Sequence, residues 1–218
     1  MLYNIKVIIV LHHLIMEDLY MSEQIEIEFK NLLNKDEFNQ LQHLFNIKPE
    51  HFVEQKNHYF DTEFFDLKEH KSALRIREKQ SFYEMTLKQP LADQEGLLET
   101  NCQLDAQTAI NIINEHGLPN NQIAEKIKNL DIDPQTIRYF GTLTTKRVEV
   151  PYQGGLLVLD HSSYFQKEDF EVEFEVHEYE QGKKDFAQLL SSMNIPLRPT
   201  QNKVERFYHE MMKKQTEE

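Results

Sequence analysis

Carboxylates recur at alternate positions in two short stretches of the chain. Glu26 and Glu28 are separated by one isoleucine, and Glu171, Glu173 and Glu175 are separated by single apolar residues. Side chains two residues apart on a β-strand point to the same face of a sheet. Carboxylate oxygens are the hard ligands that Mg²⁺ and Mn²⁺ prefer. Each stretch therefore offers a pair of ligands for a divalent cation.

Cationic side chains recur in the same way elsewhere. Arg75 and Arg77 are separated by one isoleucine, and Lys30, Lys88 and Arg147 lie on the ionic side of other alternating stretches. Arginine and lysine bind the oxygens of polyanions through charge-assisted hydrogen bonds. A polyphosphate with a bound metal ion would satisfy both the carboxylates and the cations.

Eight alternating stretches must position these side chains as strands. They span residues 24–31, 50–60, 72–79, 81–89, 96–103, 142–152, 155–164 and 169–178. Asn34 and Glu37 form a capping-box pattern that predicts a helix through Phe45. Further helical patterns lie at 105–117, 122–130, 182–193 and 201–214, and a short turn is expected at 134–140.

The apolar faces of the strands decide which way the ionic faces point. Residues such as Phe170, Val172 and Phe174 are too apolar to face water, and amphipathic helices are available to cover them. The ionic faces must then line the inside of a closed barrel, where unpaired charges would be costly unless water and ions of both signs are present. We predict an α+β fold: an eight-stranded antiparallel β-barrel that forms a tunnel, with helices packed outside.

Composition excludes several other classes of protein. The 218 residues carry a formal net charge of −13, which argues against nucleic acid or an anionic membrane as a partner. Cys102 is the single cysteine, so no internal disulfide can form, and a cytoplasmic location is expected. The six glycines form no phosphate-binding loop motif.

The chain divides into an extension and one expected domain. Residues 1–20 form an N-terminal extension, and the Met-Ser-Glu-Gln sequence at Met21 indicates that translation begins there. Residues 21–218 are expected to form a single tunnel domain with a helical insertion at about 105–140. The interrupted apolar stretch from Ile5 to Met16 is too short to span a bilayer and lacks the cleavage site of a signal peptide.

An ordered set of short motifs resembles the CYTH superfamily, also called triphosphate tunnel metalloenzymes, and in particular its small bacterial members of triphosphatase type. The motifs are Glu26-x-Glu28-x-Lys30, Tyr59-Phe60-Asp61-Thr62, Leu74-Arg75-Ile76-Arg77, Lys88, Glu99, Thr145-Lys146-Arg147-Val148-Glu149, Leu157-Val158-Leu159-Asp160, Glu171 with Glu173, and Lys203-Val204-Glu205-Arg206-Phe207. The resemblance implies an eight-stranded antiparallel tunnel that acts on triphosphates with a divalent metal.

The resemblance also implies roles for individual residues. The metal ligands would be Glu26, Glu28, Glu171 and Glu173. The phosphate oxygens would be held by Lys30, Arg75, Arg77, Lys88, Arg147 and Lys203. Glu99 and Asp160 would orient these cations or assist a second metal, and the residues closest to the chemistry would be Glu28, Lys30, Glu99 and Asp160.

Two assignments stay open. The last acidic stretch has three carboxylates, so the metal pair is either Glu171 with Glu173 or Glu173 with Glu175. Strict alternation places Asp160 on the same face as Val158, which predicts a bulge or a displaced strand at that point.

The expected activity is hydrolysis of a triphosphate with Mg²⁺ or Mn²⁺ as cofactor, and inorganic tripolyphosphate is the first substrate to consider because no aromatic slot for a base is evident. Nucleoside triphosphates and thiamine triphosphate stay open. The alternatives are an adenylate cyclase of the class IV type, which would need an adenine site, and a non-catalytic sensor of polyphosphate or nucleotide. The sequence leaves open whether the protein is a monomer or a homodimer.

Overall fold

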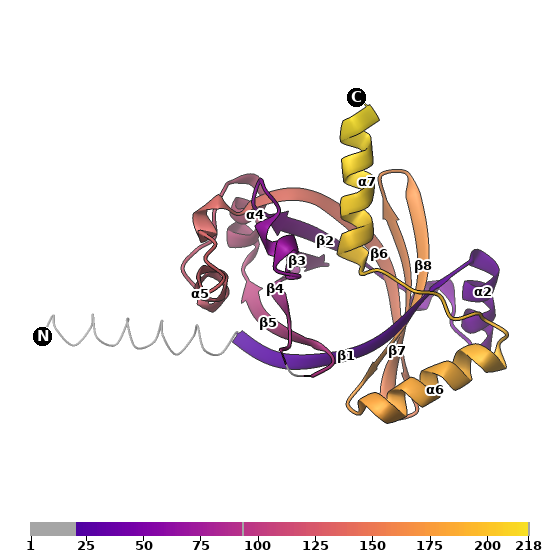
Figure 1. Cartoon of the computed structure of the whole chain (residues 1–218). Helices are drawn as coiled ribbons and strands as arrows, with labels where there is room; N and C mark the ends of the chain where they lie inside the picture. The colour runs from indigo at the N-terminus through magenta and orange to yellow at the C-terminus, as the bar shows by residue number, and fades with distance from the viewer. Residues whose placement is uncertain (1–20, 93, 218) are drawn as a thin grey trace, which may run out of the picture.

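The computed structural model describes residues 21–92 and 94–217. The proposed extension at 1–20 lies outside the described residues. Eight strands form a closed antiparallel barrel in the order β1-β5-β4-β3-β2-β6-β7-β8, which confirms the predicted fold class (Figure 1). Their bounds are β1 Met21–Leu33, β2 Val53–Asp61, β3 Ala73–Lys79, β4 Phe82–Pro90, β5 Leu97–Leu104, β6 Arg138–Tyr152, β7 Gly155–Tyr164 and β8 Lys167–Val176.

Alternation gives the barrel an apolar outer face and an ionic inner face. On β8, Val172 and Phe174 are fully buried in a cluster that includes helix residues, whereas Glu173, between them, lines the internal cavity. On β3, Leu74 and Ile76 are packed outward in the same way, and Arg75 lines the cavity. The period of two thus fixes which side chains face the lumen.

Helices cover the apolar outer face on two sides. On one side, α2 (Lys35–Leu44) and α6 (Tyr179–Ser192) pack against β1, β7 and β8. On the other side, α4 (Ala106–Asn114) and α5 (Gln122–Lys128), which lie between β5 and β6, pack against β3 and β4. The capping box expected at the start of α2 is present, since Asn34 and Glu37 exchange side-chain-to-backbone hydrogen bonds of 2.8 Å.

The short turn expected at 134–140 is present but ends earlier than predicted. A single 3-10 turn, Pro134–Thr136, is followed directly by β6, in which Tyr139 pairs with Phe60. The register between β2 and β6 shifts at this point, and Gly141 lies in the strand instead of ending the turn. A Cβ atom at Gly141 would lie 2.5 Å from the ring of Phe207, so a glycine is needed there for close packing.

The C-terminal helix α7 (Lys203–Glu217) docks on the inside of the barrel wall near one end. Phe207 is almost completely buried against Tyr59, Leu143 and Tyr164, three residues on the lumen side of β2, β6 and β7. Figure 1 shows α7 beside β6, with the end of the chain pointing away from the barrel. This docking brings the first turn of α7 to the ionic lumen.

A short helix that the alternation pattern did not predict, α3 (Asp66–Glu69), lies between β2 and β3. In the described part of the chain, no helix combines the length and the apolar character that crossing a membrane requires.

Candidate active site

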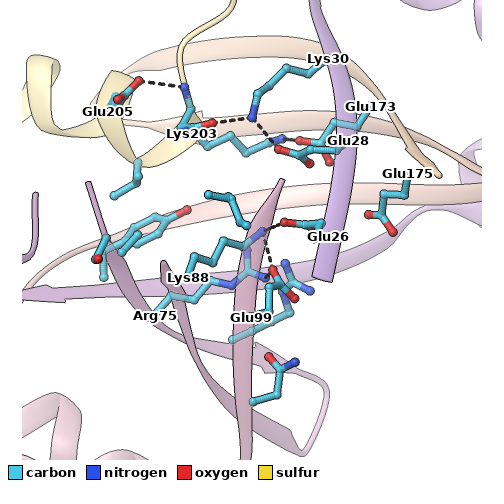
Figure 2. Close-up of a pocket in the computed structure, with 18 of the residues that line it drawn as sticks. Glu26, Glu28, Lys30, Arg75, Lys88, Glu99, Glu173, Glu175, Lys203 and Glu205 are labelled. Carbon is cyan, nitrogen blue, oxygen red and sulfur yellow. Dashed lines mark hydrogen bonds and ion pairs between the residues drawn. The ribbon is translucent and has the colours of Figure 1, made fainter. Parts of the chain in front are cut away.

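The lumen of the barrel holds a cavity of about 620 Å³ that is lined by equal numbers of acidic and basic side chains. Figure 2 labels several of these charged residues. The eight acidic residues are Glu26, Glu28, Glu84, Glu99, Glu149, Glu173, Glu175 and Glu205. The eight basic residues are Lys30, Lys68, Lys71, Arg75, Arg77, Lys88, Arg147 and Lys203. Of the twelve residues predicted from the sequence, only Asp160 and Glu171 do not line this cavity.

Lys88 lies at the centre of one cluster of charges. Its Nζ atom is 2.5 Å from a carboxylate oxygen of both Glu26 and Glu99, and Arg75 lies 3.9 Å from Glu99. Gln24 donates a further hydrogen bond of 3.1 Å to Glu99. Burial raises the pKa of Glu99, but the charges of Lys88 and Arg75 outweigh it and lower this pKa to about 2. Glu99 is therefore ionised and holds both cations in place.

Lys30 lies in a second cluster, between β1 and β8. Its Nζ atom is 2.5 Å from Glu28 and also contacts the side chain of Asn202, at the start of α7. Lys30 is opposite Glu173 in the strand pairing, and its side chain is only 19% exposed. The prediction that Lys30 lies in the tunnel and not in solvent is consistent with this position.

Glu28 and Glu175 form an unfavourable pair. They are directly opposite each other on β1 and β8, where like charges destabilise a sheet. Burial raises the pKa of Glu175 to about 7. The positive charge of Arg147, 3.9 Å away, opposes this rise, and the negative charges of Glu26, Glu173 and Glu28 add to it. Burial also raises the pKa of Glu26, although Lys88 opposes it. Lys88 and Arg147, the cations beside Glu26 and Glu175, are shared with Glu99 and Asp160, so negative charge is in excess here.

The carboxylates of β8 form a row that fastens α7. Asp169 accepts a hydrogen bond from Arg206, and Glu171 is bonded to both Arg206, at 2.8 Å, and Lys203, at 2.7 Å. Glu173 contacts Lys203 as well. Glu171 thus binds α7 and does not line the cavity, whereas Glu173 and Glu175 do line it. This geometry favours Glu173 with Glu175, the second of the two pairs that the sequence left open.

Asp160 does not line the cavity itself, but it binds two of the cations that do, Arg147 and Lys203. It is fully buried and accepts a pair of hydrogen bonds from Arg147, at 2.8 and 2.6 Å, and an ion pair from Lys203 at 2.9 Å. Burial raises the pKa of Asp160, but Arg147 and Lys203 reverse this and lower it. The irregular strand expected here is wrong, because Asp160 pairs in regular register with Arg147 and Glu171. Val158 lies two residues before Asp160 on the same face of β7. It is apolar because it packs inside the lumen, where it is fully buried.

Arg77 differs from the other predicted cations. Among the described residues no carboxylate lies within ion-pair distance of its side chain, which donates a hydrogen bond of 3.1 Å to Asn57. Burial, together with the nearby charges of Arg75 and Arg147, lowers the pKa of Arg77 to about 9. A buried cation with two cationic neighbours is stabilised by an anion, so Arg77 is well placed to bind one.

Sequence reasoning missed several residues of the cavity. Glu84 and Glu149 lie on the ionic faces of β4 and β6 and were visible in the alternation. Lys68 and Lys71 were not visible, because they follow or lie within α3, which is too short to show a periodic pattern. Tyr59 and Tyr208 also line the cavity.

The donor set fits a divalent cation, although its members do not yet converge. Among the residues that the structure describes, no three acidic, histidine or cysteine side chains meet at one point as metal ligands would. Three of the four carboxylates near β1 and β8 are turned towards lysines instead: Glu26 to Lys88, Glu28 to Lys30, and Glu173 to Lys203. The excess of negative charge around Glu175 and the hard oxygen ligands nevertheless match Mg²⁺ or Mn²⁺.

The closed antiparallel barrel, with carboxylates and cations on the walls of its lumen, has the architecture of a charged tunnel. Residues 24–208 match the model of the CYTH domain, and the chain belongs to the CYTH family, as the order of its motifs predicted.

Similar proteins come from two Bacillus species and from Hippeastrum. The chain is 45% identical over 193 residues to a Bacillus subtilis protein named "Putative triphosphatase YjbK", covering 88% of this chain and 99% of the relative. A solved structure from Bacillus halodurans, described as "a putative adenylate cyclase", is 41% identical, with a TM-score of 0.82 over 85% of this chain and 98% of the other. A Hippeastrum protein, HpAC1, shares the fold at 23% identity, with a TM-score of 0.69 over 86% of this chain and 96% of the other.

Proposed function

We propose that this protein hydrolyses inorganic tripolyphosphate inside its barrel with the help of Mg²⁺ or Mn²⁺. The observation that carries the proposal is the equal number of carboxylates and cations around one enclosed cavity. A polyanion alone would leave the carboxylates repelled, and a metal ion alone would leave the cations repelled. A metal–triphosphate complex presents positive charge to one set and negative charge to the other, so it complements both.

The carboxylates form two groups: one would bind the metal ion, and the other positions the cations. Glu26, Glu28, Glu173 and Glu175 would hold the divalent cation, which when bound would neutralise charge on the phosphoryl oxygens and lower the pKa of a nearby water. Glu99 and Asp160 act through other residues: Glu99 holds Lys88 and Arg75, and Asp160 holds Arg147 and Lys203. This division differs from a direct catalytic role for Glu99 and Asp160.

The cations would bind the substrate and stabilise the transition state. Arg75, Arg77 and Lys88 extend from neighbouring strands to the same cavity, where they would hold phosphoryl oxygens in line for attack by water. The bridging P–O bond then breaks, and diphosphate and phosphate leave. Lys30 and Lys203 would bind the same oxygens from β1 and α7.

The B. subtilis relative, at 45% identity, supports hydrolysis through its name. The description of the B. halodurans structure keeps adenylate cyclase as an alternative. Two aromatic residues line the cavity, Tyr59 and Tyr208, and both are buried with their rings packed against other aromatic rings. Neither has a free face on which adenine could stack, which favours inorganic substrates over nucleotides.

The decisive experiment measures phosphate release from tripolyphosphate, ATP and thiamine triphosphate with Mg²⁺, Mn²⁺ or EDTA. We expect release from tripolyphosphate with metal and none with EDTA. Formation of cyclic AMP from ATP would identify a cyclase instead. Tight binding without turnover under every metal condition would identify a sensor.

A further inference from the structure

Two lysines at the rim of the cavity have no acidic partner among the described residues. Lys68 and Lys71 line the cavity, and in the part of the chain that the structure describes neither forms an ion pair. The deeper cations Lys88, Arg147 and Lys203 each contact at least two carboxylates. The rim lysines are therefore available to an anion without breaking an existing pair.

The backbone that carries these lysines is fixed. The buried carboxylate of Asp61 accepts hydrogen bonds from the backbone N–H groups of Thr62, Leu67 and Lys68, at 2.8, 2.8 and 3.1 Å. Leu67 is fully buried, and the Nζ atom of Lys68 lies 5.3 Å from the centre of the Tyr208 ring. Because α3 is anchored in this way, little backbone entropy would be lost when its lysines bind a ligand.

The rim lysines extend a row of cations that runs into the barrel. Lys71 comes two residues before Ala73, and Ala73, Arg75 and Arg77 alternate along the lumen side of β3. Lys88 fills the place beside Ala73, because the two residues are paired between β3 and β4. Arg75 and Arg77, two apart on the strand, are separated by about 6.6 Å, and Lys71 precedes the strand in a left-handed turn, so cations are available to an anionic chain from this turn to the middle of β3.

The cavity is larger than a triphosphate requires. If each of the ten oxygens of tripolyphosphate takes the roughly 30 Å³ that a water molecule occupies in the liquid, the substrate fills at most about 300 Å³. The cavity holds about 620 Å³. The lining includes Lys68 and Lys71 beside the predicted cations, and since its aromatic residues are buried, the spare space suits a further phosphoryl group better than a base.

We propose that Lys68 and Lys71 form an outer subsite for a fourth phosphoryl group, and that the substrates are linear polyphosphates of four or more units as well as tripolyphosphate. This inference rests on the proposed function. The reaction is the same: water adds to the terminal phosphorus, the bridging P–O bond breaks, and phosphate leaves together with a chain one unit shorter and one proton.

Calorimetric titration with tripolyphosphate and tetrapolyphosphate in EDTA, at fixed ionic strength, tests the subsite without turnover. We expect the wild-type protein to bind tetrapolyphosphate more tightly. In the double variant Lys68→Ala/Lys71→Ala, two exposed ion pairs are lost, so tetrapolyphosphate affinity should fall about tenfold while tripolyphosphate affinity changes less than about twofold. The control is Lys35→Ala/Lys184→Ala, which removes the same charge from exposed positions outside the cavity.

An equal loss for both ligands, no loss for either, or a wild-type protein that does not bind tetrapolyphosphate would overturn the inference. The proposed function fails separately, when neither ligand is hydrolysed in the presence of metal. Binding in EDTA still decides the subsite in that case. Circular dichroism of the double variant confirms that the exposed substitutions leave the fold intact.

Discussion

At the scale of single residues, the charged side chains of the cavity hold one another in place. Lys88 is bonded to Glu26 and Glu99, and Lys30 is bonded to Glu28. Such pairs keep long side chains ordered before a ligand arrives. A bound metal–triphosphate complex would replace them, because the carboxylates would contact the metal ion and the lysines would contact the phosphates. Individual substitutions should therefore separate metal binding from phosphate binding.

Glu28→Gln should remove metal-dependent turnover while tripolyphosphate binding partly survives. The amide keeps the shape of the side chain but removes a carboxylate ligand, so kcat should fall at least about a hundredfold. Arg77→Ala should instead weaken substrate affinity by about tenfold or more, because a charged hydrogen bond is lost. Kinetics and calorimetry on both variants, with the exposed Glu50→Gln as control, would measure this. Identical behaviour of the two variants would contradict the division of roles.

Stability of the metal-free protein should depend on pH through Glu175. Its pKa is raised from 4.5 to about 7 in the folded state, so in this interval the unfolded chain has already released a proton that the folded protein keeps. Stability conferred by protonated Glu175 is therefore lost as pH rises from about 4.5 to about 7. Melting temperatures of the wild-type protein and Glu175→Gln should diverge over this window.

The divergence should be largest above pH 7, where the wild-type protein is the less stable of the two. Mg²⁺ should reduce it, because the cation compensates the ionised carboxylate. Melting curves that stay parallel between pH 5 and pH 8 would show that Glu175 does not carry this charge.

At the scale of secondary-structure elements, one buried carboxylate connects α3 with α7. Asp61 binds the backbone of α3 and also accepts a hydrogen bond of 2.7 Å from the hydroxyl of Tyr208 on α7. Burial raises the pKa of Asp61, and these hydrogen bonds oppose the rise. Because α7 carries Lys203 and α3 carries Lys68, this contact positions side chains on two sides of the cavity.

Tyr208→Phe should weaken this connection while keeping the aromatic packing. The buried Asp61 loses one hydrogen-bond donor, and the free energy of unfolding should fall by about 1–3 kcal/mol. Denaturant unfolding measures the change. Tyr139→Phe is a matched control, because its hydroxyl is bonded to Thr142 in a more exposed position and its loss should cost no more than about 0.5 kcal/mol. Equal effects of the two variants would remove the special role of Asp61.

The elements show how far the sequence alone can reach. Alternation predicted all eight strands and the inner faces of most of them, because period-two patterning follows directly from strand geometry. Alternation does not give depth along the barrel, so it could not tell that Glu171 and Asp160 lie behind the cavity wall. Pro134 and Gly141 are typical of helix ends and concealed the start of β6. The roles of the site residues stay predictions until they are tested.

At the scale of the whole molecule, β1 joins the two parts of the barrel. Its first half, from Met21 to Glu26, pairs with β5, and its second half, from Ile27 to Leu33, pairs with β8. Every other strand has a neighbour on each side. The barrel can open on this side only if the pairing of β1 with β5 or with β8 is broken.

Unfolding should therefore be a single cooperative transition. We expect the eight strands of the closed barrel to unfold together. Far-ultraviolet circular dichroism, which measures secondary structure, and tyrosine fluorescence, which measures tertiary structure, should then give the same midpoint in denaturant. The tyrosines of the described residues report on the tertiary structure without interference, since the chain contains no tryptophan. Two separated transitions would show that the strands and their helices unfold independently.

The acidic row on β8 also restricts how that strand can pair during folding. A slip of one residue would turn Asp169, Glu171, Glu173 and Glu175 towards the outer helices and would turn Val172 and Phe174 into the wet lumen. A slip of two residues would keep the faces but would move Glu173 away from Lys30, its partner in the pairing. The side chains that prepare the lumen for its ligand thus leave the strand one alignment in which the barrel can close.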